Sequence, residues 1–168
     1  MMARARGASM HAVIAHSGVA ASGESQENES APVSLLVLND HPVLRSALKW
    51  KLVATSTRCV SAEAVSISDA VSLSRHLKVD AVIVDLRIGD GNSEGVDLVS
   101  ELSKRLPDVP VIVYSDHFST GYLKSMASAG AVGYIMKSAG PDRLMSVVGN
   151  VIAGKTDFPV SASARAAV

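Results

Sequence analysis

The sequence contains a single cysteine and no long hydrophobic run, and each shortage excludes a class of protein. Cys59 has no second cysteine to pair with, so an intramolecular disulfide is impossible and a reducing compartment is favoured. We expect Cys59 to be an inert thiol in a buried strand. No segment approaches the roughly 20 apolar residues that cross a bilayer, so we expect no membrane span.

The chain also lacks an excess of charge of either sign. Lys plus Arg and Asp plus Glu both total 16, which gives a formal net charge of zero. A balanced charge provides no electrostatic basis for binding nucleic acid or an anionic membrane surface. No glycine-rich G-x-G-x-x-G or Walker-type loop follows a strand, which argues against a nucleotide-binding enzyme.

The first 33 residues differ in composition from the rest of the 168-residue chain. They are rich in Ala, Ser, Gly and Glu and show no helical pattern, so we predict a disordered extension over residues 1–33. Its short apolar stretch is interrupted by polar residues and is too weak for an export signal. We assign residues 34–156 to one folded domain and 157–168 to a C-terminal tail.

From Ser34 onward, strand and helix patterns alternate along the chain. Short apolar runs bounded by turn residues are typical of strands that are buried on both faces of a parallel sheet. We predict strands at Leu35–Leu38, Arg58–Ala62, Ala81–Val84, Val111–Tyr114 and Val132–Met136. The third and fourth of these runs are followed directly by Asp85 and Ser115.

Five helices are predicted between and after these strands. The first begins at Pro42 and has its apolar face at Val43, Leu44, Ala47, Leu48 and Leu52; the second opens at Ser68-Asp69 and includes Leu77. The others run from Val96 to Leu106, from Gly121 to Ala129, and from Pro141 to Ile152. The repeated strand–helix order predicts an α/β, doubly wound (βα)5 fold with a five-stranded parallel sheet.

Residues suited to phosphoryl transfer follow four of the strands. Asn39-Asp40, Asp85, Ser115 and Lys137 each come directly after an apolar run. In open α/β sheets, ligands bind beyond the carboxyl ends of the strands, so these side chains are expected to converge. A carboxylate can attack a phosphoryl group, two carboxylates suit Mg²⁺, and an ammonium and a hydroxyl can stabilise the transferring oxygens.

Each residue taken alone has a simpler interpretation. Asp85 and the Asn39-Asp40 pair could cap the helices that follow them. Ser115 could be a turn residue and Lys137 a solvated charge. The occurrence of all four at successive strand ends favours the functional interpretation.

The motifs identify a family resemblance. The segments "LLVLNDHPVLRSAL", "AVIVDLRIGDGNSEGVDLVSEL", "VIVYSD" and "GAVGYIMKSAGPDRL" resemble the response-regulator receiver domain of two-component signalling, a flavodoxin-like fold. The resemblance extends from Ser34 to about Pro159. The His41-Pro42 pair and the ending "VIAGKTDFP" are similar to receivers that precede a LuxR-type helix-turn-helix domain. Because the sequence ends soon afterwards, we expect no DNA-binding domain in this chain.

The resemblance implies a role for each site residue. Asp85 would be the phospho-acceptor and a Mg²⁺ ligand, together with Asp40 and the backbone carbonyl of Arg87. Asn39 would reach the metal through water. Lys137 would bind the phosphoryl group, Ser115 would be the switch hydroxyl, and Tyr134 would be the aromatic that rotates inward after phosphorylation. The alternative for Tyr134 is a half-buried core residue with a solvated hydroxyl.

Three positions depart from the family pattern. Asn39 replaces an acidic residue, which should weaken Mg²⁺ binding. Gly89 stands where proline is usual and Gly95 comes about two residues late, so the loop that presents the metal-binding carbonyl differs. Asp116 follows Ser115 where the family has a small residue, and it could repel an incoming phosphoryl group.

The resulting prediction is a non-enzymatic cytoplasmic response regulator. A sensor histidine kinase or a phosphotransfer protein would phosphorylate Asp85, and the fourth helix, fifth strand and fifth helix would form a partner or homodimer surface. The alternative is a pseudo-receiver that binds proteins without phosphorylation. A phosphatase on a similar fold is disfavoured, because such enzymes usually need a second aspartate where this chain has Arg87.

Overall fold

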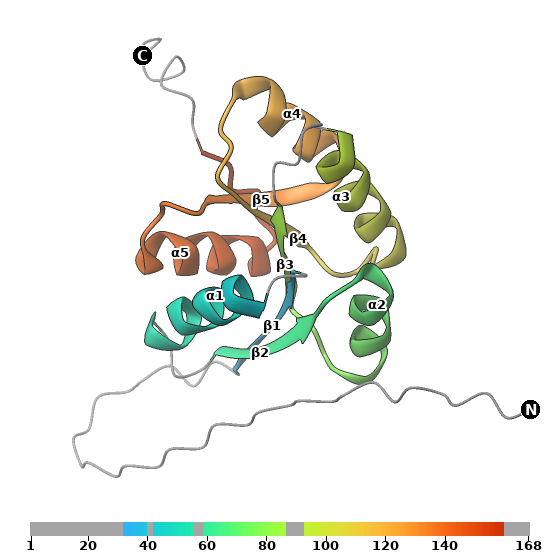
Figure 1. Ribbon diagram of the computed structural model, residues 1–168, viewed down its shortest axis with the longest axis vertical. Coiled ribbons are helices and arrows are strands. Elements are labelled where there is room, and N and C mark those ends of the chain that lie inside the picture. Colours follow the sequence, from blue (N-terminus) through green and yellow to red (C-terminus); the bar gives the residue numbers. More distant parts are fainter. Residues whose placement is uncertain (1–31, 40–41, 56–58, 87–92, 160–168) are drawn as a thin grey trace, which may run out of the picture. The chain divides into compact units, whose positions relative to one another are not determined.

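The computed structural model describes residues 32–39, 42–55, 59–86 and 93–159. These residues form one parallel sheet flanked by helices on both faces (Figure 1). The strands are β1 (Val33–Leu38), β2 (Cys59–Ala64), β3 (Ala81–Leu86), β4 (Val111–Ser115) and β5 (Ala131–Met136). The helices are α1 (Pro42–Thr55), α2 (Ile67–His76), α3 (Ser93–Arg105), α4 (Thr120–Ser128) and α5 (Pro141–Ile152).

The strand order is β2-β1-β3-β4-β5, and every neighbouring pair is parallel. This arrangement confirms the predicted doubly wound (βα)5 fold. β3 is buried on both faces along its whole length, as its continuous apolar run predicts. The carboxyl ends of the strands therefore meet at one edge of the sheet, next to a well-shielded core.

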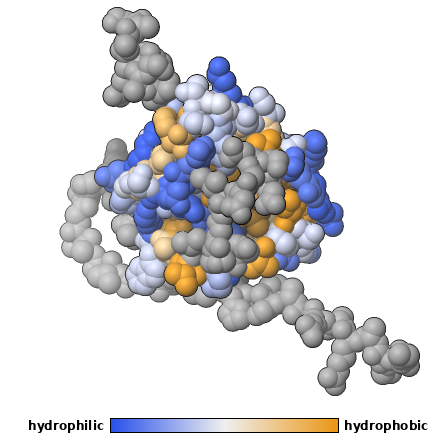
Figure 2. All heavy atoms as spheres, turned by 45° about the horizontal axis from the view of Figure 1, so that its top comes forward, coloured by the Kyte–Doolittle hydropathy of each residue, from blue (hydrophilic) through white to orange (hydrophobic). Residues whose placement is uncertain are grey.

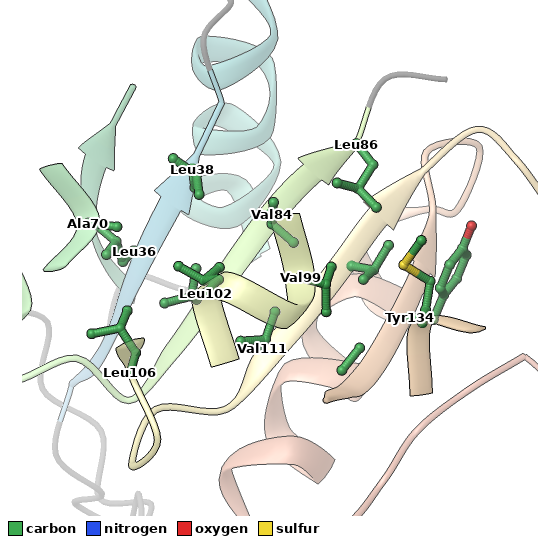
Figure 3. Packing of buried hydrophobic residues seen from close by; sticks show 14 of the residues in the cluster. Leu36, Leu38, Ala70, Val84, Leu86, Val99, Leu102, Leu106, Val111 and Tyr134 are labelled. Carbon is green, nitrogen blue, oxygen red and sulfur yellow. The ribbon is translucent and has the colours of Figure 1, made fainter. Parts of the chain in front are cut away.

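Two hydrophobic clusters cover the two faces of the sheet. One packs β-strand side chains against α2, α3 and α4, and Figure 3 shows Leu36, Val84, Leu102 and Tyr134 within it. The other packs α1 and α5 against the opposite face through Leu48, Leu52, Leu144 and neighbouring residues. A fully buried leucine contributes about 2 kcal/mol to folding, so both faces are firmly held.

The structure corrects several details of the predicted elements. In α1 only Leu48 and Leu52 of the predicted apolar face are buried among the described side chains, whereas Val43 is 77% exposed. α2 begins earlier than predicted, because Ser66 caps it by accepting a hydrogen bond from Asp69 N at 3.1 Å. Leu77 lies beyond the end of that helix and is 42% exposed. β2 runs two residues beyond Ala62, to Ala64.

Gly133 allows α5 to lie close to β5. A Cβ atom at this position would be 2.9 Å from Val151 Cγ2 and 3.2 Å from Val147 Cγ1. A separation of 2.9 Å is closer than real Cβ atoms come to other atoms, so with a larger residue here Val151 or its helix would have to shift. The absence of a side chain at Gly133 thus permits the close packing of α5 on the last strand.

The segment after α5 packs against the outer side of β5. Asp157 pairs with Gly133 in a parallel bridge, in which Tyr134 N donates to Asp157 O and Asp157 N donates to Val132 O, both at 2.9 Å. The Asp157 carboxylate is bound by Arg143 and accepts from Asn150 Nδ2 at 2.7 Å. Asp157 and Phe158, which we assigned to the tail, therefore contact the folded domain.

The carboxylate of Asp157 should make stability depend on pH. Burial raises its pKa, but the hydrogen bonds and charge of Arg143 together with Asn150 outweigh burial and hold the pKa below 3.8. A depressed pKa means that Asp157 contributes stability above its unfolded-state pKa, and this contribution is lost as pH falls through the folded-state value.

We therefore expect Asp157→Asn to lower the free energy of unfolding at pH 7 by about 1 kcal/mol, a value discounted because Arg143 is partly exposed. Urea denaturation from pH 7 to pH 2.5 should show the difference from wild type shrinking below about pH 4. Asp108→Asn removes the same charge from an exposed position and serves as the control. A constant difference across this pH range would contradict the assignment.

Candidate functional site

Asp85 lies near the carboxyl end of the central strand β3, and its side chain is only 1% exposed. The side chains that contact it come from the ends of two other strands. Asn39 directly follows β1 and donates from Nδ2 to Asp85 Oδ2. Lys137 directly follows β5, and its Nζ lies 2.5 Å from Asp85 Oδ1. The structure thus brings together three residues that are far apart in the sequence.

The environment of Asp85 contains opposing effects. Burial raises the pKa of Asp85, whereas the hydrogen bond and charge of Lys137 and the hydrogen bond from Asn39 lower it. The charge of Asp116 raises it further, and the net direction is upward from 3.8. Asp116 Oδ2 also lies 3.6 Å from Lys137 Nζ, although this carboxylate is largely exposed. A buried carboxylate beside one ammonium is suited to attack a phosphoryl group whose charge the ammonium then balances.

Ser115 lies at the same edge of the sheet but is directed to the other face. It pairs in register with Leu86, the residue after Asp85, and successive strand side chains point to opposite faces. Its Oγ accepts a hydrogen bond from His117 N at 3.2 Å, and the residue is fully buried. Lys137 N also donates to Ser115 O at 2.9 Å, so the backbones of these two residues are joined.

Tyr134 is fully buried beneath the loop that follows β4, so its ring already has the inward position that we expected only after phosphorylation. Its hydroxyl donates to the backbone oxygen of His117, and Figure 3 shows it pointing toward the same end of the sheet as Leu86. The ring packs edge-on against Tyr122 at 6.3 Å. The alternative of a half-buried tyrosine with a solvated hydroxyl is therefore wrong, because the hydroxyl has a protein acceptor.

Tyr122 is a site neighbour that the sequence did not indicate. It lies in the first turn of α4, where Ser119 accepts from its backbone N–H at 3.2 Å. Burial raises the pKa of Tyr122 and of Tyr134, and hydrogen bonding to the Ser115 side chain opposes both rises. Gly95 of α3 makes room for this ring, since a Cβ there would lie 3.2 Å from the Tyr122 hydroxyl.

Asp40, Arg87 and Gly89 lie outside the described residues. The predicted metal ligation by Asp40 and the Arg87 carbonyl, and the predicted effect of Gly89, are therefore retained as predictions. Within the described part of the chain, no three His, Cys, Asp or Glu side chains form a group that could hold a metal ion. Of the predicted metal ligands, Asp85 and Asn39 are the two that lie within the described residues.

The fold and site together define the class of the protein as an α/β receiver, with a buried aspartate and a lysine at the carboxyl edge of a parallel sheet. The family model for the response regulator receiver domain matches residues 35–149, and the chain belongs to this family. The resemblance found in the sequence motifs is thereby confirmed.

Similar proteins agree with this assignment. The methanol utilization control regulatory protein MoxX of Paracoccus denitrificans is 30% identical over 130 residues, which cover 77% of this chain and 57% of that protein. The DNA-binding transcriptional activator DevR/DosR of Mycobacterium tuberculosis is 30% identical over 124 residues, covering 74% and 56%. The matched region thus spans just over half the length of these relatives.

Solved structures show the same fold. A LuxR-family two-component response regulator from Aurantimonas sp. SI85-9A1 has a TM-score of 0.65 at 23% identity, covering 77% of this chain and 90% of that one. A CheY-like receiver domain protein from Methanospirillum hungatei has a TM-score of 0.60 at 18% identity, covering 74% and 96%.

Asn39 provides a test of the electrostatics of the site. Asn39→Asp replaces a hydrogen-bond donor with a second negative charge beside Asp85. We expect it to lower the free energy of unfolding in the absence of divalent ions by about 2 kcal/mol. We expect it also to raise Mg²⁺ affinity about ten-fold, because a hard cation prefers an added carboxylate oxygen.

Isothermal titration calorimetry and urea denaturation with and without Mg²⁺ measure the two effects. Asn39→Ala removes the same hydrogen bond without adding charge, so it should lose stability but show no gain in affinity. Equal Mg²⁺ affinity in wild type and Asn39→Asp would show that this side chain does not control metal binding.

Proposed function

We propose that this receiver domain accepts a phosphoryl group on Asp85 from the phosphohistidine of a sensor histidine kinase or a phosphotransfer protein. The observation that carries the proposal is the buried Asp85 carboxylate at the end of β3, with Lys137 Nζ 2.5 Å from one of its oxygens. A carboxylate oxygen of Asp85 attacks phosphorus as the bond from phosphorus to the imidazole nitrogen breaks. The electron pair of that bond returns to the imidazole.

Lys137 stabilises the charge on the transferring oxygens. Its ammonium lies between Asp85 and the exposed Asp116, so an incoming phosphoryl group takes over contacts that these carboxylates now make. The negative charge of Asp116 repels the incoming phosphoryl group. This arrangement favours transfer that is assisted by Lys137 and slowed by Asp116.

Mg²⁺ is the metal that this site would hold. The donor chemistry fits, because Asp85 offers carboxylate oxygens and the Asn39 amide oxygen could reach the ion through water, while Asp40 and the Arg87 backbone carbonyl would add further oxygen ligands. When bound, the ion would neutralise charge on the phosphoryl oxygens. Since Asn39 is neutral, the site has one negative charge fewer than a site with an acid at that position.

Phosphorylation would be transmitted through Ser115 and Tyr134. Because Ser115 is directed to the face opposite Asp85, its hydroxyl must move around the strand end to reach a phosphoryl group. That movement pulls the loop containing His117, whose carbonyl holds the Tyr134 hydroxyl. The surface formed by α4, β5 and α5 then changes, and this surface would bind a partner or a second copy of the chain.

Receiver domains are in general signalling modules, and we propose no catalytic turnover of a separate substrate. No helix in the described part of the chain is long and apolar enough to cross a membrane. On the face in Figure 2, hydrophobic patches are interspersed with hydrophilic residues. We place the protein in the cytoplasm and keep the proposed division into extension, receiver and tail, with Val33 moved into the receiver as part of β1 and with Asp157 and Phe158 included in it because they pack on β5.

The test is incubation with acetyl phosphate and Mg²⁺ followed by intact mass measurement. Wild type should gain one phosphoryl group, and Asp85→Asn should gain none, because the amide cannot form the acyl phosphate. Asp116→Asn is the matched control, and it should be phosphorylated at least as fast as wild type since it removes a repelling charge. Wild type that gains no phosphoryl group would instead favour a pseudo-receiver that binds proteins without phosphorylation.

A further inference from the structure

Lys51 of α1 reaches across to the residues next to the phosphorylation site. Its Nζ donates to the backbone oxygen of Lys137 at 3.1 Å and to the backbone oxygen of Ala139 at 3.4 Å. It also donates to the Tyr114 hydroxyl at 3.2 Å. One side chain therefore joins α1 to Tyr114 near the end of β4 and to the turn between β5 and α5.

Two ammonium groups lie near the ring of Tyr114. Lys51 Nζ lies 5.8 Å and Lys137 Nζ 5.9 Å from the centroid of its ring, within the range of cation–π attraction. Tyr114 also pairs in register with Asp85, so both side chains are directed to the face covered by α1 and α5. Lys51, Tyr114, Lys137 and Asp85 form a continuous series of contacts on that face.

The backbone of Lys137 is held on both sides. Its N–H donates to Ser115 O at 2.9 Å, and its carbonyl accepts from Lys51. Lys137 lies just after the end of β5, in a turn. The long Lys137 side chain can keep its ammonium on Asp85 only if the start of that side chain does not move.

We infer that Lys51, through Tyr114 and the Lys137 carbonyl, is a positioning residue that fixes Lys137 for phosphoryl transfer to Asp85. This inference rests on the proposed function. A displacement of a catalytic group by about 1 Å can cost as much as 100-fold in rate, so a contact one residue removed from the chemistry can matter.

Lys51→Met removes the ammonium and keeps most of the aliphatic stem. We expect the phosphorylation rate at saturating acetyl phosphate and Mg²⁺ to fall about ten-fold. Lys51→Arg, which can donate to both carbonyls, should recover most of the rate, whereas a role in packing alone would not require a cation. Lys49→Met is the matched control, since Lys49 is on the same helix and pairs with Glu63 at 3.7 Å instead.

A second measurement does not depend on phosphorylation. Hydrogen exchange of the Lys137 amide should be faster in Lys51→Met than in wild type and unchanged in Lys49→Met. Tyr114→Phe removes only the hydroxyl contact and should lower the phosphorylation rate about three-fold. This variant tests the inference even if Lys51→Met does not fold.

The outcomes separate the inference from the proposed function. If wild type is phosphorylated and Lys51→Met reacts at the wild-type rate, the inference is overturned and the function stands. If wild type is not phosphorylated, the proposed function is contradicted. If the exchange rate of the Lys137 amide is also unchanged in Lys51→Met, the positioning role of Lys51 is overturned as well. A slower rate together with unchanged exchange at Lys137 also overturns it, because the effect would then reach Asp85 by another route.

Discussion

The structure of the site depends on one buried carboxylate, that of Asp85. It lies near the end of β3, a strand that is covered on both faces. Burial raises the pKa of this carboxyl group, and the hydrogen bond and charge of Lys137 are the main influences that oppose the rise. Among the described residues, the neutral amide of Asn39 supplies a second contact. A carboxylate at position 39 could not donate this hydrogen bond, so in this chain the site without metal is less repulsive than one built from acids.

Strand alternation divides the residues of the site between the two faces of the sheet. Asn39, Asp85 and Tyr114 are directed to the face covered by α1 and α5, whereas Ser115 and Tyr134 are directed to the face covered by α2, α3 and α4. The proposed acceptor, Asp85, and the proposed switch residues, Ser115 and Tyr134, are thus on opposite sides of one sheet layer. Lys137 connects the two faces, because its side chain is paired with Asp85 and its backbone N–H donates to Ser115 O.

The sequence predicted the parallel sheet and the grouping of Asn39, Asp85 and Lys137, because buried strands have a strong apolar signal and their ends must meet. It did not indicate Lys51, Tyr114 or Tyr122 as neighbours of the site. Their positions next to the site depend on which helix covers which face of the sheet and on how far each side chain reaches. The local sequence pattern encodes neither. The start of α2 was misplaced for a similar reason, since Ser66 and Ser68 are equally good caps by composition and only the backbone path selects Ser66.

Tyr134 is held at both of its polar ends, and this limits how a switch can operate. Its hydroxyl donates to the His117 carbonyl, and its backbone N–H donates to Asp157 O. The Phe158 ring lies 6.5 Å from the Tyr134 ring. A rotation of Tyr134 out of the core must therefore break the hydroxyl bond and alter the packing of Phe158, although the bridge to Asp157 can persist. A change at Ser115 would in this way reach the segment after α5 through a single side chain, without any movement of the sheet.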